Sequence, residues 1–115
     1  MAVKMAAKPA AAKATEAEGT IEIILSAENM AFSEARITVP AGARVRMNFE
    51  NRDNGVNHNF ALYQDSSAVK SYFVGQIITG PASVVYTFTA PKKWGRYFFR
   101  CDVHPTMMTG TFAVT

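Results

Sequence analysis

The sequence has only one cysteine, Cys101, in 115 residues, so no disulfide can form within the chain. It has no run of the roughly 20 apolar residues that a membrane-spanning helix needs, and its N-terminus lacks the apolar core of a signal peptide. The net charge is +3, but the basic residues are scattered among apolar neighbours instead of forming a dense stripe. We therefore expect no nucleic-acid partner and no direct membrane insertion.

A catalytic set is also lacking. No Ser, His and Asp combination or carboxylate pair can be recognised, because the acidic residues fall on predicted solvent-exposed faces and turns: Glu22, Glu28, Glu34, Glu50 and Asp53. We therefore expect that the chain is not an enzyme.

The length fits one domain, since domains commonly have about 100 to 150 residues. Residues 1–19 are rich in Ala and Lys, and we interpret them as a flexible tail or linker. From residue 20 the character changes, and 49% of the whole chain is hydrophobic, which is enough for an ordinary core. Residues 20–115 are therefore the predicted folded domain.

Alternation of apolar and polar residues predicts strands in this domain. Ile21, Ile23 and Leu25 share one face of the first segment. Further strands are predicted within 35–42, 44–51, 57–63, 74–78, 83–91, 92–101 and 110–114, with Pro, Gly and Asn turns between them. About eight short strands without a convincing amphipathic helix are typical of an all-β Greek-key sandwich.

Sulfur and imidazole are concentrated near the C-terminus. Cys101 and His104 are related as C-x-x-H, and Met107 and Met108 follow closely. The other histidine, His58, lies far upstream, but a sandwich could bring its strand beside this loop. One thiolate, two imidazoles and a weak axial thioether are the ligand set of a blue copper electron-transfer site.

Each of these residues also has a structural interpretation, because free cysteine is among the most buried residue types and methionine often fills gaps in a core. The presence of one cysteine and two histidines at positions that match one ligand geometry favours metal ligation. Zinc binds the same residue types and stays an alternative occupant, although structural zinc sites usually have four Cys or His ligands and this chain has three such residues.

The segments "NHNF", "GRYFFRCDVHP" and "MTGTFAV" resemble the cupredoxins, the small blue copper proteins that include plastocyanin, azurin and amicyanin. The resemblance covers about residues 20–115 and implies an eight-stranded Greek-key sandwich with one type 1 copper that cycles between Cu(I) and Cu(II). It implies that His58, Cys101 and His104 are copper ligands. It also implies that Asn59 tethers the two ligand loops and polarises the cysteine sulfur.

Two methionines compete for the axial position. The family often has Gly two residues after the axial Met, and Met108 with Gly110 fits that pattern, so we expect Met108 to be the ligand. Met107 is the alternative, since it gives the shorter H-x-x-M spacing. Arg100 stands where plastocyanin has an aromatic residue before the cysteine, so an exit route for electrons through that position is not expected here.

The resemblance implies a one-electron carrier, monomeric and periplasmic or otherwise extracytoplasmic, that docks redox proteins at an apolar rim near His104 and Pro105. Two alternatives stay open from the sequence. The chain could be a copper storage or delivery module, or a copper domain of a larger membrane-anchored redox protein to which residues 1–19 form the linker.

Overall fold

Strands make up all the regular secondary structure in the computed structural model, which describes residues 16–17 and 19–115. Four of the twelve strands in this part are only two residues long: β1 Glu16–Ala17, β3 Ala31–Phe32, β6 Asn57–His58 and β9 Ile78–Thr79. The other eight are β2 Thr20–Glu28, β4 Arg36–Val39, β5 Arg44–Asn51, β7 Ala61–Tyr63, β8 Ser71–Val74, β10 Ala82–Thr89, β11 Gly95–Arg100 and β12 Thr109–Val114. The prediction of an all-β fold with about eight strands is confirmed.

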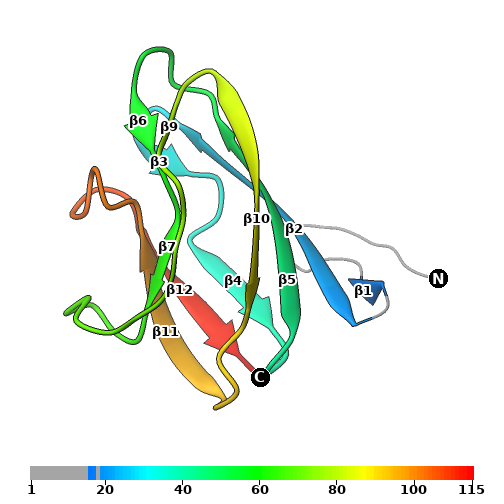
Figure 1. The fold of residues 1–115 in the computed structure, drawn as a ribbon. Coiled ribbons are helices and arrows are strands. Elements are labelled where there is room, and N and C mark those ends of the chain that lie inside the picture. Colours follow the sequence, from blue (N-terminus) through cyan, green and yellow to red (C-terminus); the bar gives the residue numbers. More distant parts are fainter. Residues whose placement is uncertain (1–15, 18) are drawn as a thin grey trace.

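The strands form two facing sheets, which Figure 1 shows as two layers. One sheet has the order β1-β2-β5-β10, with β3 also paired to β2, and the other has the order β4-β12-β11-β7-β8. The pairs β2–β5 and β4–β12 are parallel, and the remaining strand pairs are antiparallel. A separate pair, β6–β9, holds the first histidine at one end of the sandwich.

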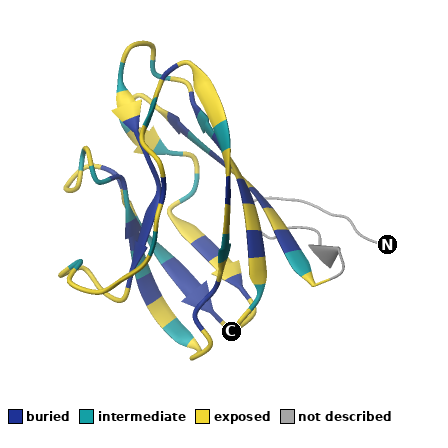
Figure 2. Ribbon diagram, in the orientation of Figure 1, coloured by how far each residue is buried: buried dark blue, intermediate teal, exposed yellow. Residues whose placement is uncertain are grey.

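The sequence alternation sets which side chains enter the core. In the β2–β5 register Ile23 lies opposite Met47 and Leu25 opposite Phe49, and all four are buried. Figure 2 shows the result as alternating buried and exposed bands along the strands. Burial of each such side chain contributes about 1.5 to 3 kcal/mol before the entropy of ordering is subtracted.

Aromatic rings join the two sheets near the centre of the core. The Phe60 ring lies 5.3 Å from that of Phe99 and 5.9 Å from that of Phe88, which stacks on Phe73 at 4.7 Å. Ring pairs at such distances contribute beyond their buried area. Phe99 belongs to this cluster and precedes Cys101 by two residues, so the end of β11 is anchored in the core.

The predicted strand over 57–63 is divided in the structure. It forms β6 and β7, with Asn59 and Phe60 between them outside either strand. Both side chains are fully buried, Phe60 in the aromatic cluster and Asn59 in hydrogen bonds to other segments. The interruption removes the strict alternation of faces that a continuous strand imposes, so Asn59 and Phe60 need not point to opposite faces of a sheet.

The tail expected at 1–19 lies mostly outside the described residues. Within it, Glu16–Ala17 form β1 and pair with β2. The boundary of the tail therefore stays a prediction. In the described part of the chain, no helix is long and apolar enough to cross a membrane.

Candidate metal centre

Strand β11 carries Cys101 to the end of the sandwich. Tyr97 and Phe99 point into the core from this strand, and Cys101 continues their alternation and is fully buried. Its backbone N–H donates to the carbonyl of Met108 at 3.0 Å, which closes the loop between β11 and β12. Cys101 is thus fixed directly after the last residue of β11.

The loop after Cys101 is a series of tight turns. The N–H of His104 donates to the carbonyl of Cys101 at 3.1 Å, and the N–H of Met108 donates to the carbonyl of His104 at 3.1 Å. These bonds place the second imidazole and the thioether within one compact loop.

His58 brings the other imidazole to the same place from β6. Its ring is fully buried, and Nδ1 lies 3.7 Å from Sγ of Cys101. Two ligands of one ion would be this far apart with metal–nitrogen and metal–sulfur bonds of about 2.1 and 2.3 Å and an angle of about 115°. The spacing of these two donors therefore fits a shared metal ion.

The second imidazole stands beside this pair. The His58 and His104 rings are 5.0 Å apart between centroids and inclined by 64°. Nε2 of His104 is buried and has no hydrogen-bond partner, a costly situation for a ring nitrogen that a ligand would relieve. Within residues 16–17 and 19–115, no three His, Cys, Asp or Glu side chains gather closely enough to hold an ion by themselves, so the structure brings together two donors and leaves His104 adjacent.

The two methionines differ sharply in burial. Met108 is 1% exposed and belongs to the core, whereas Met107 is 64% exposed. Gly110 lies in β12, two residues after Met108, and pairs with Phe99 of β11. A Cβ at Gly110 would lie 2.2 Å from Cζ of the Phe99 ring. Close packing of the strand against this ring explains the glycine that follows the buried methionine.

Asn59 links the two segments that carry the donors. Its Oδ1 accepts the N–H of Asp102 at 2.8 Å, and its Nδ2 donates to the carbonyl of Gly75 at 2.9 Å and to Oδ2 of Asp102 at 3.3 Å. Asn59 follows His58, and Asp102 follows Cys101. The hydrogen bonds therefore hold the two donor-bearing segments together.

Asp102 is a residue that the sequence did not point to. Its Oδ1 accepts from the hydroxyl of Tyr63 at 2.7 Å and from Nε of Arg100 at 2.9 Å. Burial opposes ionisation of Asp102, but the hydrogen bonds from Tyr63, Arg100 and Asn59 outweigh it and leave its pKa below the ordinary value. Arg100, at the position where plastocyanin has an aromatic residue, thus anchors the ligand loop through its hydrogen bond to Asp102.

Asp53 was also missed, although it touches a predicted ligand. Its Oδ2 lies 2.8 Å from Nε2 of His58, and its carboxylate accepts the backbone N–H groups of Asn29 and Met30. The hydrogen bond from His58, followed by those from Met30 and Asn29, lowers the pKa of Asp53 to about 2. The only sequence signal was an acidic residue in a turn-rich segment, which gives no reason to pair it with His58.

Comparison with known proteins bears on this donor set. Residues 1–114 match the family described as cupredoxin-like domain. The chain belongs to the cupredoxin family. Auracyanin-A of Chloroflexus aurantiacus is 29% identical in an alignment of 120 positions that covers 83% of this chain and 74% of that protein.

Solved cupredoxin structures share the fold. Auracyanin A, a "blue" copper protein from Chloroflexus aurantiacus, superposes with a TM-score of 0.75 at 24% identity, covering 84% of this chain and 100% of that one. Rusticyanin from Thiobacillus ferrooxidans gives a TM-score of 0.62 at 19% identity, covering 86% and 79%. The cofactor of this family is one type 1 copper ion, and His58, Cys101 and Met108 are arranged here as a ligand set for it.

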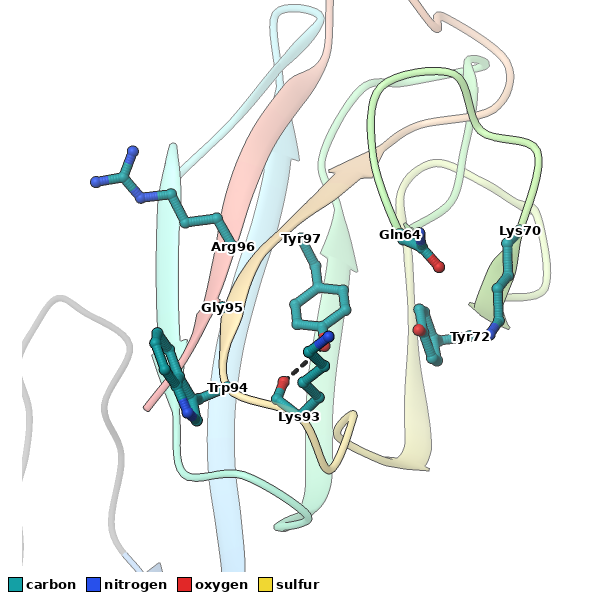
Figure 3. A pocket seen from close by; sticks show the side chains of 8 residues that line it. All are labelled: Gln64, Lys70, Tyr72, Lys93, Trp94, Gly95, Arg96 and Tyr97. Atoms are coloured by element: carbon teal, nitrogen blue, oxygen red, sulfur yellow. Dashed lines mark hydrogen bonds between the residues drawn. The ribbon is translucent and has the colours of Figure 1, made fainter.

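A separate open groove lies at the end of β11 that is farther from Cys101. The strand itself is about 17 Å long at 3.3 Å per residue. Figure 3 shows its lining, in which Tyr97 donates a hydrogen bond to the carbonyl of Lys93 at 2.6 Å. Its aromatic and basic residues include Tyr72, Trp94 and Arg96 but none of the donor residues. The groove is therefore distinct from the candidate metal centre.

Proposed function

We propose that this chain is a one-electron carrier whose copper ion is held by His58, Cys101, His104 and Met108. The observation that carries the proposal is the buried pair of donors from β6 and β11, with Nδ1 of His58 3.7 Å from Sγ of Cys101. Bound copper would supply the Cu(I)/Cu(II) couple, since soft sulfur suits Cu(I) and imidazole accepts both states.

The residues of the chain favour electron transfer over catalysis. His58 and Cys101 are both fully buried, so water does not reach them and a substrate has no exposed position beside them. Asn59 and Asp102 fix the two donor-bearing segments relative to one another through hydrogen bonds. A frame held in this way limits movement of the ligands between redox states, which is what an electron carrier needs.

The exposed tip of the ligand loop supports docking of a redox partner. Val103 is 37% exposed and Met107 64% exposed, and Pro105 and Thr106 between them are exposed too. We define Val103, Pro105 and Met107 as the apolar rim, and His104 lies within the same loop. A small apolar surface of this kind favours transient contact with redox proteins, and the chain is proposed to act as a monomer.

Membership of the family supports a periplasmic or other extracytoplasmic location.

A copper storage or delivery role would call for an accessible pair of methionines. Met108 is buried, so only Met107 is available for such a role, and the carrier is favoured. Rapid transfer of copper to an apo acceptor combined with slow electron exchange would reverse this preference.

The test is the visible and electron-spin spectrum of the protein loaded with one equivalent of Cu(II). We expect intense blue or green absorption from a thiolate-to-copper transition, lost in Cys101→Ser and in His58→Ala. Asp65→Asn, in an exposed turn, is the control that should keep the spectrum. A colourless wild-type complex, or colour that survives in Cys101→Ser, contradicts the proposal.

A further inference from the structure

The carboxylate of Asp53 joins three segments behind His58. Oδ1 accepts the N–H of Asn29 at 2.6 Å, and Oδ2 accepts the N–H of Met30 at 3.0 Å and faces Nε2 of His58 at 2.8 Å. Asn29 and Met30 both have positive φ, 56° and 59°, so their N–H groups belong to a tight turn between β2 and β3. This turn therefore holds both oxygens of the carboxylate that contacts the ring.

The backbone of Asp53 is fixed as well. Its N–H donates to Oδ1 of Asn51 at 2.9 Å, and the buried Asn51 amide donates to the carbonyls of Val56 and Ile78. Gly80 packs so closely that a Cβ there would lie 2.2 Å from the carbonyl oxygen of Asp53. Asp53 therefore has little freedom to turn away from His58, and its side chain is only 12% exposed.

An ionised carboxylate can only accept hydrogen bonds, so Nε2 of His58 must be the donor in this contact. In a neutral ring the other nitrogen, Nδ1, then carries the lone pair, and it is Nδ1 that lies 3.7 Å from Sγ of Cys101. The carboxylate thus selects the tautomer that can bind a metal. Partners of this kind also raise the basicity of a ligating imidazole.

We propose that Asp53 is the positioning residue for His58, which fixes its tautomer and, by its negative charge, favours the more positive oxidised state of the metal. This inference rests on the proposed function, in which His58 is a copper ligand. The turn at Asn29–Met30 is then part of the site's support, although it lies far from the ligands in sequence.

The experiment compares wild type with Asp53→Asn and, as a control matched in net charge, Asp65→Asn. Asp65 accepts hydrogen bonds from Ser67 in an exposed turn and contacts none of the donor residues. The ¹⁵N chemical shifts of the His58 ring in the metal-free protein report its tautomer. Competition with chelators of known affinity gives the binding constants for Cu(II) and Cu(I).

In wild type and Asp65→Asn we expect the Nε2–H tautomer. In Asp53→Asn we expect a shift toward the Nδ1–H tautomer and a 10- to 100-fold loss of Cu(II) affinity, the range typical of such partners. Cu(I) affinity should fall less. Each tenfold loss of Cu(II) affinity relative to Cu(I) affinity raises the reduction potential by about 59 mV.

An unchanged tautomer together with an affinity ratio within twofold of wild type overturns the proposal, as does an equal change in Asp53→Asn and Asp65→Asn. Should Asp53→Asn fail to fold, Asp53→Glu keeps the charge and should retain the wild-type tautomer; its loss there also overturns the proposal. If wild type forms no coloured copper complex, the proposed function fails, yet the ring tautomer still decides the role of Asp53.

Discussion

Replacing Met108 separates its packing from its proposed ligation of copper. The side chain is 1% exposed and lies in the core, so truncation to Ala leaves a cavity in that core. Met→Ala changes at such sites cost about 2 to 5 kcal/mol in the free energy of unfolding. Met108→Leu conserves volume and should cost less than about 1.5 kcal/mol while removing the sulfur.

Met107 supplies the contrast. It is 64% exposed, so Met107→Ala should change the free energy of unfolding by no more than about 0.5 kcal/mol. Urea unfolding of the metal-free variants measures these differences. The visible spectrum and reduction potential of the copper-loaded Leu variants then show which sulfur the metal contacts, because the axial ligand tunes the potential.

We expect Met108→Leu to change the spectrum and potential and Met107→Leu to leave both unchanged. The reverse result would assign the axial position to Met107 and refute the reasoning from burial. A loss below about 1 kcal/mol in Met108→Ala would refute the packing argument separately, since it falls below the range for core truncation.

Two further predictions concern the frame and the rim. Asn59→Ala removes a fully buried amide and leaves the N–H of Asp102 and the carbonyl of Gly75 unpaired, so we expect a loss of about 2 to 5 kcal/mol in urea unfolding; a loss under 1 kcal/mol would contradict this. Met107→Asp places a charge on the apolar rim and should slow electron self-exchange, measured by NMR line broadening in mixtures of Cu(I) and Cu(II) protein, with the visible spectrum unchanged. An unchanged rate would place docking elsewhere.

The strands could be predicted from sequence because a half-buried strand leaves a period of two. Ile23 and Leu25 in β2 and Met47 and Phe49 in β5 show it plainly, and the structure buries all four. The period fails at 57–63, where successive residues are buried. There the requirement for an inward Asn59 beside His58 overrides strand geometry, and periodicity carries no sign of it.

The cluster from Cys101 to Met108 could be predicted because its members are rare residue types close together in sequence. The residues that hold this cluster in place could not be predicted. Asp53 and the turn at Asn29–Met30 reach His58 only through the pairing of β2, β3 and β5, which brings distant segments together. Asp102 lies within the predicted loop, but its partner Tyr63 comes from β7, and a hydroxyl in a strand gives no indication of its acceptor.

The buried asparagine and histidine residues in the described part of the chain lie together at one end of the sandwich. The buried residues of polar or charged type there are Asn51, His58 and Asn59, and each belongs to the donor set or to its support. A buried polar group destabilises a fold unless it is hydrogen-bonded, and these three have partners from β9, the Asp53 loop and the ligand loop. Since these bonds form between protein groups alone, the frame holds His58 against Cys101 without help from a metal. Copper should therefore enter a nearly formed site, with the adjustment concentrated at His104, whose buried ring nitrogen has no protein partner.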